Sequence, residues 1–174
     1  MYRMSQKPMI TAEQIQKRIR ELAAGIAASY EFDVILSALT GAYMFTADLS
    51  RALAKPQIRI AFIKASSYGD GTESSGQIKV SGLEKIDLKG KRVLLVDDIL
   101  DTGNTMFALT HMLKDTGAAE VRTCVLMNKE ERRTADIHAD FVGFEIRNEF
   151  VVGYGLDYAE EYRTLPDIWT LEET

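Results

Sequence analysis

Residues 93–105 read Val93-Leu94-Leu95-Val96-Asp97-Asp98-Ile99-Leu100-Asp101-Thr102-Gly103-Asn104-Thr105. Four aliphatic residues in a row are typical of a parallel strand that is buried on both faces. The polar stretch from Asp97 to Thr105 predicts a turn, and Met106, Leu109, Met112 and Leu113 then recur at helical spacing. A strand, a turn and a helix in this order favour an α/β protein.

The same alternation extends to both sides of this stretch. We expect helices at 11–30 and 43–53, and Thr11 and Gln14 have the spacing of a capping box at the start of the first. We expect strands at 34–37, 58–63, 78–80, 121–127 and 141–146. The chain therefore predicts one α/β domain over residues 1–174, with a mostly parallel central sheet flanked by helices.

The composition is that of an ordinary soluble globular protein. The chain has 174 residues, of which 46% are hydrophobic and 27% charged, so it needs no disulfide or metal to support its core. Its one cysteine, Cys124, lies in an apolar run and predicts a buried thiol in a reducing compartment. The net charge of −5 argues against a protein that wraps nucleic acid non-specifically. Without a long apolar stretch or a signal-peptide core, we expect neither a membrane protein nor a secreted one.

The polar part of residues 93–105 predicts a phosphate site beside a group of carboxylates. Asp97, Asp98 and Asp101 bring three acidic residues into five positions, and small residues follow at the start of a helix. A helix N-terminus binds phosphate, and paired carboxylates hold ribose hydroxyls or a hydrated Mg²⁺. The pattern is neither a P-loop nor the Gly-rich dinucleotide fingerprint. For any single aspartate, a strand end or a helix cap is the alternative.

Residues 93–105 closely resemble the phosphoribosyl-pyrophosphate (PRPP) motif of type I phosphoribosyltransferases: an aliphatic strand, two acidic residues, two aliphatics, then Asp-Thr-Gly-x-Thr. Residues 141–146 and 149–158 are similar to the purine-binding hood of hypoxanthine-guanine phosphoribosyltransferases. Ser67-Tyr68-Gly69 resembles the catalytic flap of that family, at the head of a polar loop, 66–76, that we expect to act as a mobile lid. The resemblance implies a type I phosphoribosyltransferase fold, with its core at about 30–140 and a small hood from about 1–15 and 141–174.

The resemblance also implies a role for each matching residue. Asp101 is expected to be the general base near N7 of the purine. The residues expected to hold ribose and the 5′-phosphate are Asp97, Asp98, Thr102, Gly103, Asn104 and Thr105. Those expected at the pyrophosphate are Thr40, Gly41, Ser67, Tyr68 and Arg163, and those expected at the purine are Lys129, Phe150, Val151 and Asp157. The expected Mg²⁺ ligands are Asp97, Asp98 and Asp157.

Several of these residues have a plainer interpretation outside the family. Lys129 would open a solvated charged turn, Phe150 would be a core residue, and Tyr68 and Arg163 would lie on the surface. The chain also departs from the family at Thr40, because a basic residue usually precedes Gly41 in the turn after the early strand. The backbone amides of that turn remain able to bind pyrophosphate.

The resemblance implies a Mg²⁺-dependent purine-salvage enzyme that converts hypoxanthine and/or guanine plus PRPP to IMP or GMP and pyrophosphate. We expect a cytoplasmic homodimer or homotetramer, with no nucleic-acid or membrane partner. The alternative is a regulator of the same fold that binds PRPP or a nucleotide together with RNA or DNA. The net charge of −5 counts against that regulator. A receiver-like domain is a weaker rival, since receivers place their acidic pair after the first strand.

Overall fold

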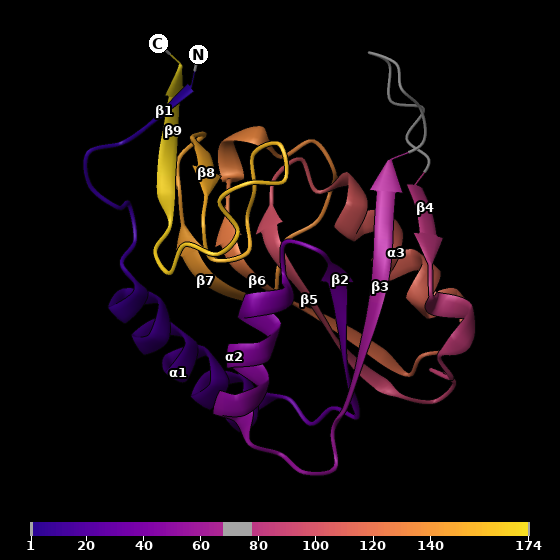
Figure 1. Cartoon of the computed structure of the whole chain (residues 1–174). Helices are drawn as coiled ribbons and strands as arrows, with labels where there is room; N and C mark the ends of the chain where they lie inside the picture. Colours follow the sequence, from indigo (N-terminus) through magenta and orange to yellow (C-terminus); the bar gives the residue numbers. More distant parts are fainter. Residues whose placement is uncertain (1, 68–77, 174) are drawn as a thin grey trace.

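A six-stranded sheet forms the centre of the protein, in the order β4-β3-β2-β5-β6-β7 (Figure 1). The computed structural model describes residues 2–67 and 78–173. The strands of this sheet are β2 (Val34–Leu39), β3 (Arg59–Ser67), β4 (Ile78–Ser81), β5 (Arg92–Leu100), β6 (Glu120–Asn128) and β7 (Phe141–Glu145). Every neighbouring pair is parallel except β3 and β4. This confirms the expected α/β fold with a mostly parallel sheet.

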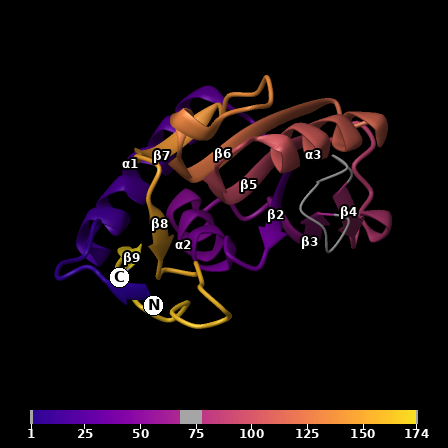
Figure 2. The same ribbon diagram turned by 90° about the horizontal axis from the view of Figure 1, so that it is seen from above.

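Helices cover both faces of the sheet (Figure 2). The helices are α1 (Ala12–Ser29), α2 (Tyr43–Leu53) and α3 (Asn104–Asp115), and two short 3-10 turns are η1 (Leu83–Lys85) and η2 (Glu130–Arg132). Successive side chains of β5 point to opposite faces. Leu94 and Val96 pack in one core with α1 and α2, whereas Val93 and Leu95 pack in a second core with α3. The continuous aliphatic run is therefore buried on both sides, as the sequence predicts.

Local sequence signals explain how the first helix begins. The Thr11 hydroxyl accepts the Gln14 amide at 3.2 Å, and the Gln14 side chain accepts the Thr11 amide at 2.8 Å. This reciprocal pair is the predicted capping box, and it satisfies two amides at the helix start.

Cys124 is fully buried in β6, which confirms the expected buried thiol. None of the helices in the described ranges has the length and apolarity needed to cross a membrane.

A smaller antiparallel sheet is built from the two chain termini, and we call it the hood. Its strands are β1 (Tyr2–Met4), β9 (Trp169–Glu173) and β8 (Phe150–Val152), in that order. Residues 141–145 do not belong to it, which corrects the expected hood boundary at 141. They form β7 and pair with β6, where Gly143 is so close to the Leu126 carbonyl that a Cβ would lie 2.4 Å from its oxygen. The C-terminal part of the hood therefore begins at Phe150.

Candidate active site

The carboxyl ends of β2 and β5 lie side by side at the middle of the sheet. The chain leaves β2 into α2 on one face and leaves β5 into α3 on the other face. A point where neighbouring connections diverge in this way is where open α/β sheets bind ligands. Gly41, just after β2, is in such close contact with Asp98 of β5 that a Cβ would overlap the carboxylate oxygen. No side chain larger than glycine fits there without displacing Asp98.

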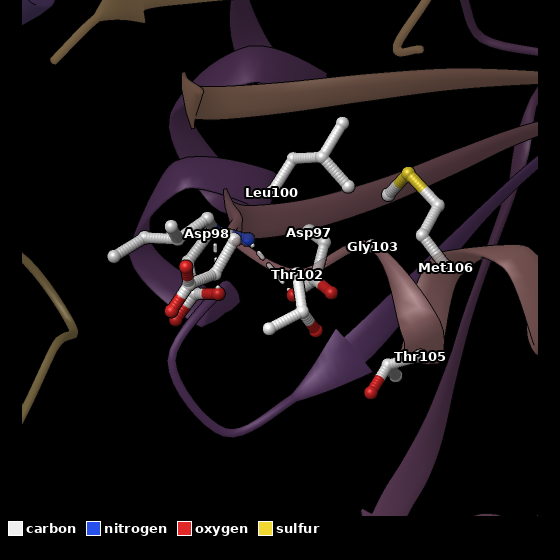
Figure 3. A pocket seen from close by; sticks show the side chains of 9 residues that line it. Asp97, Asp98, Leu100, Thr102, Gly103, Thr105 and Met106 are labelled. Atoms are coloured by element: carbon white, nitrogen blue, oxygen red, sulfur yellow. Dashed lines mark hydrogen bonds between the residues drawn. The ribbon is translucent and has the colours of Figure 1, made fainter. Parts of the chain in front are cut away.

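Two adjacent cavities open at this edge. The first, which we call the β5 cavity, has a volume of about 240 Å³ and is lined by residues 97–103, 105 and 106 (Figure 3). The second, which we call the hood cavity, has a volume of about 250 Å³ and is lined by Asp98, Ile99, Asp101, Lys129, Arg132, Phe150, Val151, Leu156 and Asp157. Asp98, Ile99 and Asp101 line both cavities. A ligand that fills both would therefore pass directly over these three residues.

Asp97 and Asp98 lie within β5, whereas the sequence predicted a turn from Asp97 onward. The pairing of β5 with β2 stops at Val96, but its pairing with β6 continues to Leu100. The hydrogen bonds of β6 thus extend the strand beyond its aliphatic part. Beyond Val96, β5 has β6 as its only strand partner in the described sheet, so its other edge, toward β2, faces the Thr40–Ala42 turn.

The two adjacent carboxylates are electrostatically costly. Each accepts the amide of the next residue, at 2.8 Å from Asp98 and at 2.7 Å from Ile99. Burial, and then repulsion from Asp98, raise the pKa of Asp97 well above its usual value. Burial also raises the pKa of Asp98, while the Arg163 guanidinium acts in the opposite direction. A cation or hydroxyl donors bound here would offset this repulsion.

The turn after β5 presents unpaired amides to the β5 cavity. Gly103 has φ +85° and leads into α3, whose first turn has free N–H groups. Within the described residues, the amides of Thr102, Gly103 and Thr105 find no acceptor, and that of Asn104 reaches only the Thr102 hydroxyl at 3.4 Å. Free amides at a helix N-terminus form an anion site. The residues expected at a phosphate are therefore brought together here.

Lys129 lies at the far side of the hood cavity. It follows β6, its amide donates to the Leu100 carbonyl at 2.9 Å, and the residue is only 6% exposed. Burial lowers the pKa of its ammonium, and the nearby Asp101 carboxylate raises it less. The interpretation of Lys129 as part of a solvated turn is wrong. Although most of the residue is buried, its ammonium has neither a hydrogen bond nor an ion pair among the described residues, so it is available to a ligand oxygen in the cavity that Lys129 lines.

Phe150 is 48% exposed at the start of β8 and lines the hood cavity, so its interpretation as a core residue is also wrong. Its ring stacks near Tyr2 at 6.2 Å between centroids and meets Tyr158 edge-on at 5.8 Å. Val151, the next residue, is buried and keeps its backbone beside the cavity. The sequence interpretation assigns no role to either aromatic partner: Tyr2 lies at the other end of the chain, and Tyr158 enters only as part of the stretch 149–158.

Asp101 lies between the two cavities and faces a second basic residue. Arg132 Nε is 3.2 Å from Asp101 Oδ1, which is within ion-pair range, although the angle does not meet that of a hydrogen bond. Asp101 Oδ1 is buried beneath this arginine and accepts no hydrogen bond from the other described residues. The side chain is nevertheless 38% exposed and lines both cavities, so the rest of its carboxylate is available to accept a proton or a hydrogen bond from a ligand.

Arg163 and Asp157 form an ion pair at the open edge of the site. Arg163 Nη2 lies 3.1 Å from Asp157 Oδ1, and Nη1 donates to the Gly155 carbonyl at 2.8 Å. Gly155, with φ +98°, packs on the Gly41 carbonyl, where a Cβ would lie 2.4 Å from the oxygen. The loop after β8, which contains Gly155, therefore contacts the Thr40–Ala42 turn. Because Arg163 is hydrogen-bonded to Gly155, its guanidinium lies near this turn, where Thr40 replaces the basic residue usual in the family.

Two of the expected residues are not tested by this geometry. Ser67 is the last residue of β3, and only its backbone is described. Tyr68 and the remaining residues of the expected lid, 69–76, lie outside the described residues. The sequence interpretation missed Arg132, which lines the hood cavity, and also Arg133 and Asn128, which line neither cavity but are hydrogen-bonded to each other behind the site. Only the charged run Lys129–Arg133 hinted at the two arginines.

Comparison with known proteins agrees with this site. A family described as "Phosphoribosyl transferase domain" matches residues 9–159. The chain is 44% identical to a hypoxanthine-guanine phosphoribosyltransferase of Aquifex aeolicus, with 96% of this chain and 95% of that protein aligned. It is 40% identical to that of Bacillus subtilis, over 96% and 93%. A solved hypoxanthine phosphoribosyltransferase of Trypanosoma cruzi superposes with a TM-score of 0.89 at 41% identity, over 97% and 96%. The chain therefore belongs to the phosphoribosyltransferase family, in its hypoxanthine-guanine group.

Proposed function

We propose that the protein transfers the 5-phosphoribosyl group of PRPP to N9 of hypoxanthine or guanine. The bond from C1′ to the pyrophosphate oxygen breaks, the bond from C1′ to N9 forms, and IMP or GMP leaves with pyrophosphate. The observation that carries the proposal is the shared wall of the two cavities. Asp98 and Asp101 line both, so a phosphoribosyl group in the β5 cavity would meet a base in the hood cavity beside these carboxylates.

The amides of Thr102, Gly103 and Thr105 would hold the 5′-phosphate, since these residues line the β5 cavity and their amides have no acceptor among the described residues. The Asn104 amide, which reaches only the Thr102 hydroxyl at 3.4 Å, would join them. Arg163 and the amides of Thr40 and Gly41 would bind pyrophosphate. In most of the family a side-chain cation would help at position 40. Here Arg163, which approaches the same turn through Gly155, would supply the main positive charge.

On the other side of the wall, Phe150 would stack on the purine and the backbone of Val151 would pair with its edge. Lys129 would donate to the 6-oxo group, and Asp157 would line the far end of the base. This explains selection for 6-oxopurines. An ammonium can only donate, so the 6-amino group of adenine would face it donor to donor, and such a mismatch costs several orders of magnitude in specificity.

Asp101 would act as the general base. Its side chain lines both cavities and is 38% exposed, so its accessible carboxylate oxygen would take the proton that the purine releases as N9 bonds to C1′, or return it in the reverse direction. The carboxylates of Asp97 and Asp98 would hold the ribose hydroxyls. Their negative charge would also stabilise the positive charge that develops on the ribose ring.

Mg²⁺ is the proposed cofactor, and the residues present fit it. Asp97 and Asp98 provide adjacent, mutually repelling carboxylates for one ion. Asp157 does not form a three-residue group with them among the described residues, and beside Arg163 it would help to bind a second Mg²⁺. Oxygen ligands of few protein residues, completed by water and substrate phosphates, are what Mg²⁺ prefers. When bound, the ion would neutralise charge on the leaving pyrophosphate. Binding of PRPP to a chain of net charge −5 would depend on that neutralisation.

We also propose a cytoplasmic homo-oligomer, as a dimer or tetramer. Ile60 and Phe62 are 47% and 45% exposed and lie two residues apart on β3, hence on one face of the strand. A second copy of the chain would bury these apolar side chains. Sedimentation at micromolar concentration tests this: a monomer would contradict the proposal.

The activity is tested by incubating the protein with PRPP, Mg²⁺ and each of hypoxanthine, guanine, xanthine and adenine, followed spectrophotometrically. We expect turnover of hypoxanthine and guanine, none of adenine, and loss of activity when EDTA removes the metal. No turnover with any base would overturn the proposal. It would favour the regulator, which salt-dependent binding of RNA or DNA would then reveal.

A further inference from the structure

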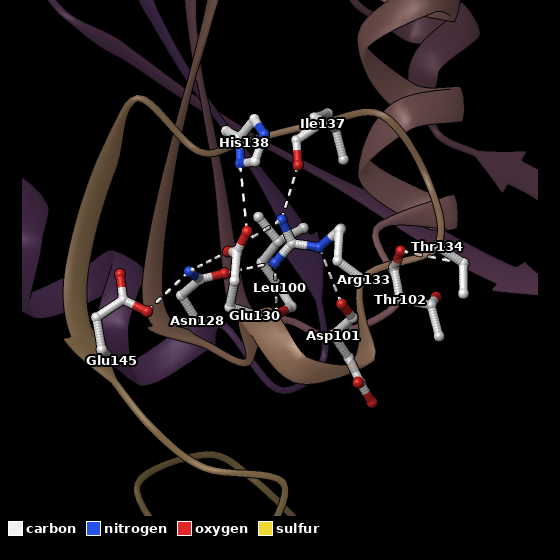
Figure 4. A network of polar contacts seen from close by, with 10 residues as sticks. All are labelled: Leu100, Asp101, Thr102, Asn128, Glu130, Arg133, Thr134, Ile137, His138 and Glu145. Carbon is white, nitrogen blue, oxygen red and sulfur yellow. Dashed lines mark hydrogen bonds and ion pairs between the residues drawn. The ribbon is translucent and has the colours of Figure 1, made fainter.

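Arg133 lies at the centre of a polar network behind the β5 cavity (Figure 4). It directly follows η2, and its side chain is only 8% exposed. Its guanidinium donates to the Asp101 carbonyl at 3.1 Å, to the Leu100 carbonyl at 3.4 Å and to the Ile137 carbonyl at 2.7 Å. A buried arginine whose hydrogen bonds go mainly to backbone carbonyls organises the loop that carries them.

The neighbouring backbone extends this contact along the same turn. The amide of Lys129 donates to the Leu100 carbonyl, and those of Thr134 and Ala135 donate to the Thr102 carbonyl at 2.9 and 3.1 Å. The carbonyls of residues 100, 101 and 102 are thus all held by the segment 129–135. With the carbonyl side of the turn occupied in this way, its amides remain directed to the β5 cavity.

Arg133 is itself held in orientation from the other side. Its Nη2 donates to Asn128 Oδ1 at 2.5 Å, and the Asn128 amide nitrogen donates to Glu145 at 2.8 Å and to Glu130 at 3.2 Å. These bonds leave the Asn128 oxygen facing the guanidinium. The Arg133 side chain also packs on Gly103, where a Cβ would lie 2.9 Å from Arg133 Cδ.

We propose that Arg133 is a positioning residue, which holds the Leu100 and Asp101 carbonyls so that the Asp101 carboxylate meets the purine and the amides of residues 102–105 meet the 5′-phosphate. Arg133 lines neither cavity, so it would act only through this turn. The inference rests on the roles proposed above for Asp101 and for the turn. It adds a residue that links the end of β6, where Lys129 lies, to the phosphate side of the site.

The positioning role should require the planar arrangement of donors of the guanidinium as well as its positive charge. It directs donors to three backbone carbonyls and one side-chain oxygen at once, which the single ammonium of lysine does not reproduce. Arg133→Met should therefore lower kcat about a hundredfold, the order of loss that a misplacement of about 1 Å produces. The KM for PRPP should rise about tenfold, while the KM for hypoxanthine stays within about twofold, since the purine contacts remain.

Three further measurements separate positioning from a purely structural role. Arg133→Lys keeps the charge and should remain as impaired as Arg133→Met. In Arg133→Ala, millimolar guanidinium should restore part of kcat, whereas sodium at the same ionic strength should not. Arg122→Met is the matched control. Arg133 lies 3.8 Å from Glu130 in addition to its carbonyl contacts, and Arg122 likewise pairs with a glutamate and a backbone carbonyl, and stacks on Tyr30, on a distant part of the sheet. It should keep wild-type kcat.

A wild-type kcat in Arg133→Met, with only a lower melting temperature, would overturn the inference. So would full activity of Arg133→Lys, since a charge alone would then suffice. Asp101→Asn, assayed in parallel, distinguishes this failure from that of the proposed site. If Asp101→Asn loses turnover and Arg133→Met does not, the inference alone fails. If neither loses turnover, the assignment of Asp101 as the base fails with it.

Discussion

The two cavities of the site differ in how the chain builds them. The β5 cavity is lined by a single stretch, residues 97–106 without Asn104. The hood cavity is lined by residues from four separate segments: Asp98, Ile99 and Asp101; Lys129 and Arg132; Phe150 and Val151; and Leu156 and Asp157. The first arises from local chemistry, namely a strand end, a left-handed glycine and a helix start. The second exists only once β6, β8 and the loop after β8 have been brought to the same edge of the sheet.

This difference suggests that the β5 cavity binds the phosphate and the hood cavity selects the base. A contiguous turn, held by hydrogen bonds from the segment 129–135, is a rigid place for the phosphate, which the substrate and the product nucleotide share. An assembled wall is a place where single residues set which base is accepted. The two meet at Asp98, Ile99 and Asp101, so substitutions should fall into three classes: those that impair both sides, the phosphate side alone or the base side alone.

Asp101→Asn should have the largest effect, because Asp101 belongs to both walls. The amide keeps the shape but cannot take a proton, so kcat should fall by about 10²- to 10⁴-fold, the range for loss of a general base. IMP binding, measured by calorimetry, should stay within about threefold, since transition-state interactions are what is lost. Unchanged turnover would remove Asp101 from the reaction.

The sequence alone predicts much more of the first cavity than of the second. Val93–Thr105 is short, and each of its residue types carries its own physical meaning, so a phosphate site and its carboxylates could be derived directly. The end of β5 could not be predicted correctly, because hydrogen bonds to β6, a distant part of the sequence, extend the strand through Asp97 and Asp98. Lys129 and Phe150 could be assigned only by family resemblance. Their burial and exposure are the reverse of what their neighbours in sequence suggest.

Gly103→Ala should impair the phosphate side alone. Gly103 has φ +85°, and a Cβ would lie 2.7 Å from Ile137 Cγ2, so the turn must shift. We expect the KM for PRPP to rise about 10- to 100-fold and stability to fall by about 1–3 kcal/mol. Gly25→Ala is the control, since Gly25 lies in α1 with open space around it, and it should stabilise by about 0.5–1 kcal/mol. Equal PRPP kinetics in both variants would contradict a rigid phosphate turn.

The pH dependence of base binding should separate the hood cavity from the rest of the site. Burial lowers the pKa of Lys129 below that of an ordinary lysine, so the ammonium is charged below this lowered pKa and loses its proton as the pH rises through it. Arg in its place stays charged throughout. The test is to measure the KM for hypoxanthine of the wild type and of Lys129→Arg between pH 7 and pH 10. The ratio of the wild-type KM to the variant KM should rise, by up to about tenfold per pH unit, once the pH exceeds the pKa of Lys129. Ionisation of the base itself cancels in this ratio. A ratio that stays flat through the pH at which the Lys129 ammonium loses its proton, followed by NMR, would exclude Lys129 as a charged donor.

The smallest effect should come from Tyr154→Phe, which tests how the assembled wall is kept in place. Tyr154 is buried after β8, and its hydroxyl donates to Asp48 of α2, which also accepts from Gln16 at 2.8 Å. Burial and the Asp48 carboxylate raise the pKa of Tyr154, so the phenol stays protonated as a donor at neutral and moderately alkaline pH. Its removal should cost about 1–2 kcal/mol in urea unfolding.

Tyr158→Phe is the control for this substitution, because Tyr158 is 38% exposed and its hydroxyl has no hydrogen-bond partner among the described residues. It should unfold at the wild-type urea concentration. If Tyr154→Phe did so too, the loop after β8 would be held by packing alone, through Gly155 on Gly41 and Gly153 on Asp167. A loss confined to Tyr154 would instead mean that the base side of the site depends on one long-range hydrogen bond to α2. The phosphate side, in contrast, is fixed by several hydrogen bonds from the segment 129–135.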